Sequence, residues 1–279
     1  KYIVRESILD NLPFEEITSR IDCYSSVMLF DIDVKLRERL LIYCFSKGKR
    51  VYMLPNTAEI LNNNAYNIQI SDSPILLYKN NCLTIEQELI KRFMDLILSL
   101  IGLVLFSPIM LICALLIKLY DGGPIFFKQV RVTKGNKKFV LIKFRSMLVD
   151  AEKDGAQKST KNDDRITPIG KIIRTLRIDE TPQFFNVLQG VMSIVGPRPE
   201  RVENVEEYSK LVPEFNLRHK VKAGLIGYAQ VYGKYNTTPK DKLNMDLLYI
   251  QQYSILNDIK YILLTIKIIF MRKSTEGFD

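Results

Sequence analysis

The 279-residue sequence contains no tryptophan and only one histidine, His219. Histidine-based acid–base catalysis could therefore use this residue alone, so carboxylates are the better candidates for such chemistry. The four cysteines lie far apart and form no Cys-x-x-Cys pair. This spacing argues against a zinc site or a disulfide framework and fits reduced cytoplasmic thiols.

The sequence also lacks a signal-peptide pattern, a basic segment followed by a short apolar run. It begins at Lys1 rather than at a methionine, so we expect a fragment of a longer chain, with membrane segments upstream left open.

The chain carries more basic than acidic residues, 40 against 31. The net charge of +9 and the pI near 9.2 favour an anionic partner, either nucleic acid, anionic lipid or a phosphorylated substrate. No helix-turn-helix, zinc spacing or RNP-type aromatic strand accompanies the basic residues. We therefore expect no nucleic-acid partner.

Residues 1–83 show α/β character. Apolar runs at Val27–Phe30 and Arg50–Leu54 predict strands on either side of a helix over Lys35–Ser46. Shorter strands are expected at Asn67–Ile70 and Ile75–Tyr78. Without a Gly-x-Gly-x-x-Gly motif a dinucleotide site has no support, so we expect a regulatory or dimerisation module, which allows a homodimer.

A long apolar helix should follow. Thr84 and Gln87 form a capping-box pattern, and the uncharged run Leu96–Leu116 is long enough to reach across a bilayer core, which takes about 20 residues. Ser107 and Pro108 lie near its middle, and basic residues flank both ends. A re-entrant hairpin and a spanning helix both fit this pattern; a buried helix of a soluble protein fits less well because the run is long.

Three polar residues precede the apolar run. Asp95 lies four residues after Lys91 and three after Arg92, so it can pair with both on one helical face. At a membrane boundary such pairing would anchor the helix depth; the alternative is an ordinary solvated surface pair.

From Asp121 onward the sequence predicts a compact catalytic domain. Strands are expected over Ile125–Val130 and Lys138–Phe144, joined by a turn at Gly135-Asn136. The polar segment Lys153–Asp164 predicts a mobile loop.

Two later segments leave alternatives open. The segment Ile259–Phe270 is apolar, with Lys260 and Lys267 on one face. It suits either an amphipathic helix on a membrane surface or a terminal helix packed on the core. The glycine-rich segment Lys222–Lys234 suits either a flap with its two lysines facing phosphate or a plain connection.

Two adjacent carboxylates are the strongest chemical signal. Asp179 and Glu180 precede Thr181-Pro182, which predicts a helix from Pro182 to Leu188 ending at Gly190. Such a pair can supply a nucleophile and a metal ligand or base. Acidic residues are also common at helix starts for electrostatic reasons alone.

Cations surround this pair in the sequence. Arg198 stands between two prolines, which limit its freedom and suit bidentate phosphate binding. Lys143 and Arg145 alternate on one strand face, and Arg165 adds further positive charge. Together the carboxylates and cations suggest phosphoryl chemistry.

A series of short motifs follows in order along the chain. They are Lys91-Arg92-x-x-Asp95, Ser107-Pro108, Gly123–Arg131, Lys143–Met147, Asp164–Gly170, Asp179–Gln183, Gly196–Glu200, Lys222–Gly233 and Asp246-x-x-Tyr249-Ile250. In this order they resemble the bacterial sugar transferases, monotopic enzymes that transfer a sugar 1-phosphate to a polyprenyl phosphate. The N-terminal part is similar to the end of the Rossmann-like domain of longer members.

The resemblance implies an α/β N-terminal module (1–83), a re-entrant membrane helix (84–120) and an α+β membrane-associated catalytic domain (121–279) with amphipathic surface helices. It implies that Asp179 attacks a UDP-sugar, that UMP leaves, and that polyprenyl phosphate then accepts the phosphosugar. Glu180, with Asp179, would bind Mg²⁺ or help to activate the acceptor.

The resemblance also assigns supporting roles. Substrate binding falls to Lys143, Arg145, Arg165, Arg198, Glu200 and Gln230, and membrane anchoring to Lys91, Arg92, Asp95, Ser107 and Pro108. The expected location is the bacterial inner membrane, with the lipid bilayer as partner and the catalytic domain on the cytoplasmic face. The product would start a surface polysaccharide, and the sugar is not legible from the sequence.

Two positions depart from the family pattern. Val191 stands where an aspartate is expected, and the segment Arg131–Gly135 lacks the commoner early glycine. Neither touches the carboxylate pair or Pro197-Arg198-Pro199. Two rival functions are a membrane-tethered protein that senses a nucleotide without catalysis, and a basic nucleic-acid-binding protein, against which the apolar run counts.

Overall fold

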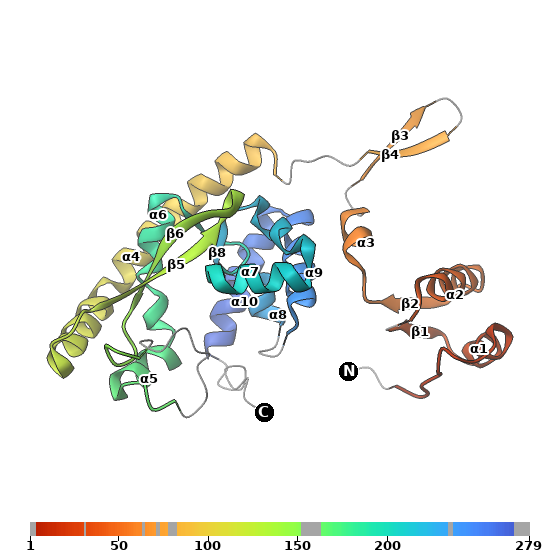
Figure 1. Cartoon of the computed structure of the whole chain (residues 1–279). Coiled ribbons are helices and arrows are strands. Elements are labelled where there is room, and N and C mark those ends of the chain that lie inside the picture. Colours follow the sequence, from red (N-terminus) through yellow and green to blue (C-terminus); the bar gives the residue numbers. More distant parts are fainter. Residues whose placement is uncertain are drawn as a thin grey trace. The chain divides into compact units, whose positions relative to one another are not determined.

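The computed structural model of the chain describes residues 4–30, 32–62, 65–70, 73–77, 83–151, 163–233 and 237–270 (Figure 1). Two compact units divide the chain, Lys1–Ala58 and Glu59–Asp279. Each is described by itself.

The first unit contains a parallel strand pair joined by a helix. Its elements are α1 (Phe14–Ile21), β1 (Ser26–Leu29), α2 (Val34–Ser46) and β2 (Arg50–Met53). Strands β1 and β2 pair in parallel from Ser26 opposite Arg50 to Leu29 opposite Met53, which requires a crossover such as α2. The α/β character is confirmed, while a Rossmann-like fold stays a prediction.

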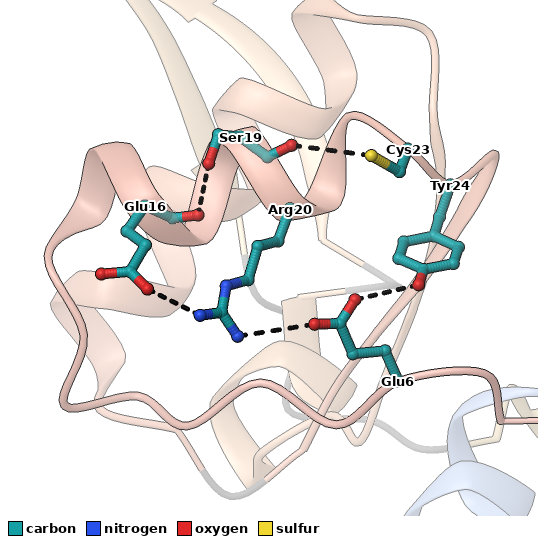
Figure 2. A network of polar contacts seen from close by, with 6 residues as sticks. All are labelled: Glu6, Glu16, Ser19, Arg20, Cys23 and Tyr24. Carbon is teal, nitrogen blue, oxygen red and sulfur yellow. Dashed lines mark hydrogen bonds and ion pairs between the residues drawn. The ribbon is translucent and has the colours of Figure 1, made fainter.

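Polar contacts tie α1 to the segment before it (Figure 2). Arg20 pairs with Glu16 at 2.7 Å and with Glu6 at 3.5 Å, and the Tyr24 hydroxyl donates to Glu6 at 2.9 Å. These groups are exposed, so the pairs add little to stability.

The second unit begins with small elements and one long helix. They are α3 (Thr57–Asn62), which starts just before the division, the antiparallel pair β3 (Tyr66–Ile70) and β4 (Ser73–Leu77), and α4 (Ile85–Asp121). The capping box of α4 is present, because Gln87 N donates to Thr84 Oγ1 at 3.2 Å and Thr84 N donates to Gln87 Oε1 at 2.9 Å. The strands and the helix start agree with prediction.

Helix α4 continues through Pro108. Proline has no N–H for the carbonyl four residues back, Val104 O, and the Ser107 hydroxyl donates to that carbonyl at 2.8 Å. By length and composition α4 could cross a membrane, and only 17% of its most apolar 18-residue window is buried. This exposure argues against a helix buried in a soluble core. The re-entrant course stays a prediction.

The polar start of α4 differs from the expected surface pairs. Lys91 Nζ pairs with Asp258 at 2.6 Å, and Arg92 donates to the carbonyls of Val187 and Leu188 at 2.6 and 2.7 Å. Asp95 is buried and accepts from Ser193 Oγ at 2.9 Å and Ile194 N at 2.8 Å. The predicted Asp95 pairing and the solvated alternative are both wrong, because packing offers each residue a buried partner from a distant segment.

The rest of the unit contains two further strand pairs (Figure 1). Strands β5 (Phe126–Thr133) and β6 (Lys137–Phe144) form an antiparallel hairpin around the tight turn η1 (Lys134–Asn136), which confirms the predicted hairpin. Strands β7 (Met192–Val195) and β8 (Ala223–Ile226) pair in parallel. The helices are α5 (Pro168–Thr175), α6 (Gln183–Gln189), α7 (Val202–Leu211), α8 (Tyr228–Tyr232), α9 (Pro239–Gln251) and α10 (Ile255–Phe270), with 3₁₀ turns η2 (Ile178–Glu180) and η3 (Pro213–Lys220).

Apolar residues from most of these elements share one core, including Val187, Met192, Phe215, Leu243 and Leu247. Helix α4 approaches α6 closely at Gly102, where an added Cβ would lie 2.7 Å from the Phe184 ring. Glycine at this position therefore lets Phe184 pack against α4.

Two open alternatives are settled in part. Helix α10 buries Asp258 and Tyr261 but exposes Leu256 and Leu263, so it packs on the core by one face only. The glycine-rich segment forms β8 and α8 rather than an irregular flap, and Lys234 lies outside the described residues. The predicted loop Lys153–Asp164 also lies outside them, except for its last two residues.

Candidate active site

The carboxylate pair lies in a turn directly before α6. Arg177 takes a left-handed conformation, with φ of 57°, and leads into η2, which contains Asp179 and Glu180. Helix α6 then runs Gln183–Gln189 and ends at Gly190, whose φ of 85° favours glycine. The predicted helix is confirmed within one residue. Asp179 is only 9% exposed, so the pair faces inward from the turn.

Two cations from distant segments meet Glu180. Lys143 Nζ, on β6, lies 3.0 Å from Glu180 Oε1, and Arg198 Nη2 lies 2.7 Å from the same oxygen. Arg198 belongs to the Pro-Arg-Pro loop that follows β7. The structure thus brings together three of the predicted site residues from three parts of the sequence, with Asp179 beside them.

The two neighbouring carboxyl groups titrate differently. Burial raises the pKa of Asp179, and the adjacent Glu180 charge adds to this effect. Burial also opposes ionisation of Glu180, but the charges of Arg198 and Lys143 outweigh it and hold the pKa of that carboxyl well below its usual range. Burial lowers the pKa of Lys143 despite the nearby Glu180. Glu180 is therefore a fixed anion, while Asp179 is the more basic carboxylate.

The loop that carries Arg198 is held by close backbone packing. Gly196 N donates to Ile226 O at 2.8 Å, and Gly224 N donates to Pro197 O at 2.9 Å. A Cβ on Gly224 would lie 2.1 Å from Gly196 N, so only glycine allows this approach. The β7–β8 pair consequently fixes where the loop leaves the sheet.

Two other predicted binding residues have partners of their own. Arg145 is buried and donates to Asp121, at the end of α4, at 2.7 Å. Arg165 pairs with Asp163 at 2.6 Å and donates to Ala151 O at 3.1 Å. Their partners are therefore outside the carboxylate pair, and their substrate roles stay predictions.

Glu200, in the same loop as Arg198, has partners outside the carboxylate pair. It pairs with Lys242 at 2.7 Å and lies 3.7 Å from Arg218. Burial opposes its ionisation, but Arg218 and Lys242 prevail and lower the pKa of Glu200 to about 2. Glu200 therefore anchors the loop by its charge.

Gln230 lies near the same loop. A Cβ on Gly227 would meet Gln230 Oε1 at 2.9 Å and Arg198 N at 3.3 Å, so Gly227 lies between the Gln230 side chain and the loop backbone. Gln230 Oε1 is buried and accepts no hydrogen bond within the described part of the chain. A binding role for Gln230 stays a prediction.

The single histidine lies away from this site. His219 is buried, and its Nδ1 lies 2.6 Å from Asn136 Oδ1 in the β5–β6 turn. Burial, with the charge of Arg218 adding, lowers the pKa of His219 to about 4. It is thus a neutral structural residue.

Sequence reasoning gave no role to Arg218, although it is fully buried beside the loop and donates to Arg198 O at 2.8 Å. Its position close before the glycine-rich segment offered no local pattern that could reveal this contact.

The carboxylate pair suits a magnesium ion shared with substrate. Mg²⁺ usually binds through one or two carboxylates together with substrate phosphates and water. Asp179 and Glu180 supply such a pair, and among the described residues no cluster of three or more potential ligands occurs. The two carboxylates thus fit an ion held jointly with a diphosphate.

Comparison with known proteins gives consistent matches. The sequence profile described as "Bacterial sugar transferase" matches residues 86–272. The UDP-N-acetylgalactosamine-undecaprenyl-phosphate N-acetylgalactosaminephosphotransferase of Aeromonas hydrophila is 46% identical over 183 residues, 64% of this chain and 43% of that protein. The UDP-glucose:undecaprenyl-phosphate glucose-1-phosphate transferase of Klebsiella pneumoniae is 41% identical over 211 residues, 74% of this chain and 45% of that protein.

The chain therefore spans less than half the length of these two relatives. A shorter relative, the exopolysaccharide production protein PSS of Rhizobium leguminosarum bv. phaseoli, is 40% identical over 186 residues, which are 63% of this chain and 93% of that protein.

Proposed function

Because the chain belongs to the bacterial sugar transferase family, we propose that it transfers a sugar 1-phosphate from a UDP-sugar to undecaprenyl phosphate and releases UMP. The observation that carries the proposal is the contact of Lys143 and Arg198 with Glu180, directly beside Asp179. The product, an undecaprenyl diphosphate sugar, would begin the assembly of an exopolysaccharide, capsule or O-antigen.

The reaction proceeds in two displacements. In the first, a carboxylate oxygen of Asp179 attacks the phosphorus that bears the sugar. The bond from that phosphorus to the bridging oxygen of the diphosphate breaks, and UMP leaves with the electron pair. In the second, a phosphate oxygen of undecaprenyl phosphate attacks the same phosphorus and displaces the carboxylate. Dividing one transfer into two steps is the general logic of covalent catalysis.

The electrostatics of the site support Asp179 as the nucleophile. Its raised pKa marks it as the more basic of the two carboxylates, whereas Glu180 is held by two cations. Lys143 and Arg198 would exchange this carboxylate for the donor diphosphate and stabilise the charge that develops on its oxygens.

Magnesium belongs to the proposal as a substrate-shared ion. Bound Mg²⁺ would reduce the repulsion between an anionic nucleophile and an anionic diphosphate. Glu180 and Asp179 are the residues that would hold it.

The proposed location is the bacterial inner membrane. The exposed apolar surface of α4 supports membrane association. Basic residues at both ends of the apolar run fit a re-entrant helix with both ends, and the catalytic part, on the cytoplasmic side.

Intact mass spectrometry tests the chemistry. The protein in detergent is incubated with Mg²⁺ and a panel of UDP-sugars, without lipid acceptor. We expect a mass gain of one phosphosugar from the correct donor. We expect the gain to be absent in Asp179→Asn, whose turnover with undecaprenyl phosphate should fall on the order of 10³-fold or more.

Asp10→Asn is the matched control, because Asp10 is an exposed aspartate of the first unit; it should react like the parent protein. Unchanged turnover in Asp179→Asn would disprove the mechanism. Binding of UDP-sugar without adduct or UMP release would instead favour a nucleotide-sensing binding protein.

A further inference from the structure

Helix α9 presents three polar residues on one face toward the loop that carries Arg198. Lys242, Asp246 and Tyr249 are spaced four and three residues apart, which places them on the same side of a helix. Lys242 pairs with Glu200 at 2.7 Å, and the Tyr249 hydroxyl lies 3.1 Å from Val195 O. These contacts hold both ends of the segment Val195–Glu200.

Asp246 is connected to the middle of the segment Val195–Glu200 indirectly, through Arg218. Arg218 Nη2, from η3, lies 2.7 Å from Asp246 Oδ2 and donates to Arg198 O at 2.8 Å. One guanidinium nitrogen therefore links the α9 carboxylate to the backbone of the arginine that contacts Glu180. The Phe215 ring supports this guanidinium from one side, with its centroid 4.9 Å from Arg218 Cζ.

A gain in folding stability does not explain the buried ion pair of Arg218 and Asp246, because burying its two charges is costly. The Arg218 side chain is 0% exposed and that of Asp246 is 1% exposed, and taking two charges out of water costs as much as their attraction returns. Within the described residues neither Asp246 oxygen makes a hydrogen bond, nor do Arg218 Nε and Nη1, so the contact between Arg218 and Asp246 is an ion pair. Burial, against the charge of Arg218, raises the pKa of Asp246 to about 6, so the carboxylate is ionised at pH 7.

We propose that Asp246 and Arg218 form a positioning pair, which fixes the Arg198 backbone so that its guanidinium meets Glu180 and, during turnover, the donor diphosphate. The proposal rests on the proposed function and deepens it. The prolines on either side of Arg198 limit rotation about its neighbours. The hydrogen bond from Arg218 to the Arg198 carbonyl therefore restricts the position of the Arg198 backbone from which the side chain extends.

A double-mutant cycle with UDP binding tests the pair. UDP is the part common to all the donors considered, and its Kd is measured by calorimetry in detergent with Mg²⁺. We expect Asp246→Asn and Arg218→Lys each to raise the Kd about 10-fold in the parent protein. In an Arg198→Ala background each should raise it less than about 2-fold, because residues that act through one partner are not additive.

Lys240→Gln, on an exposed position of α9, is the control and should leave the Kd unchanged. Melting temperatures are measured alongside. A merely structural role would lower the melting temperature and the active fraction without changing the Kd of the folded fraction. Equal increases in both backgrounds, or no increase in the parent, would overturn the positioning role.

The outcomes separate the two proposals. A parent protein that binds UDP but forms no phosphosugar adduct would overturn the proposed chemistry alone, and the cycle would still decide the positioning role. A parent protein that does not bind UDP would overturn both.

Discussion

Asp179 and Glu180 are neighbours in the chain, yet their carboxyl groups face different surroundings. Arg198 and Lys143 both contact one oxygen of Glu180, whereas the pKa of Asp179 rises because the side chain is buried beside another carboxylate. Opposite environments for two adjacent acids are a common way to divide acid–base and nucleophilic roles. Both residue types could be read from the sequence. Which of the two carboxylates is the more basic depends on Lys143 and Arg198. These cations are distant in the sequence and come close to the pair only in the folded structure.

His219 gives a prediction at the scale of one residue. Its folded pKa of about 4 lies below the unfolded value of 6.5, so the unfolded chain gains the proton first as pH falls. Stability is therefore lost as pH drops from 6.5 toward 4, by about 2 kcal/mol between pH 7 and pH 5. In detergent, the melting temperature of the parent protein should fall by about 5 °C more over this interval than that of His219→Gln.

Differential scanning fluorimetry at both pH values measures this difference. Lys210→Gln, an exposed substitution on α7, should behave like the parent protein. Equal pH dependence in the parent and His219→Gln would contradict the assignment of a neutral, buried imidazole.

Helix α4 shows which parts of an element local sequence can predict. Its start follows from Thr84 and Gln87, which contact each other within one turn, and the serine beside Pro108 accounts for the continuous backbone. Both signals act within a few residues. The same holds for the turn at Gly135 and the end of α6 at Gly190.

The partners of Lys91 and Asp95 could not be predicted in this way. A local helix pair contributes only a few tenths of a kcal/mol, so burial against another element readily replaces it. Lys91 instead pairs with Asp258, 167 residues away. Asp246 belongs to one of the motifs, but its contact with Arg218 could not be predicted for the same reason, since nothing local indicates it.

Arg92 joins two elements and gives a prediction at this scale. Its guanidinium donates to two carbonyls at the end of α6, Val187 O and Leu188 O. Methionine keeps much of the side-chain volume but leaves both carbonyls without these donors. Arg92→Met should therefore destabilise the second unit by about 2–3 kcal/mol and lower its melting temperature.

The control Lys210→Met exchanges an exposed cation on α7 and should have little effect on the melting curve in detergent. Arg92→Lys should fall between parent and methionine variant, because one ammonium group cannot reproduce the fork geometry. A melting temperature of Arg92→Met equal to that of the parent would show that these contacts contribute nothing.

At the scale of the whole molecule, the family match lies entirely within the second unit. The match covers residues 86–272 and leaves out the first unit, Lys1–Ala58. The Rhizobium relative consists almost entirely of the matched region. The short strands of the first unit were predictable from their apolar runs, but its role was not, because no motif in it carries chemistry.

A shortened chain of residues 59–279, the second unit, should therefore keep the proposed first step. We expect its rate of phosphosugar adduct formation to lie within about threefold of the parent rate, since separate domains usually act independently. Intact mass spectrometry over a time course measures it, with Asp179→Asn in the short chain as the negative control. A fall of more than about 10-fold with an unchanged melting temperature would assign the first unit a part in catalysis.

The contact of Glu180 with Lys143 and Arg198 means that the resting site carries its own counter-ion. An incoming anion finds Lys143 and Arg198 already paired and reaches these two cations only by exchange with a tethered carboxylate. Small singly charged anions such as chloride gain too little from that exchange, because the carboxylate is already held at a high effective concentration. A diphosphate, with several oxygens and more than one charge, offers the cations a better partner and releases Glu180 as it binds. The internal carboxylate therefore favours the binding of polyvalent phosphate esters over the binding of simple monovalent anions.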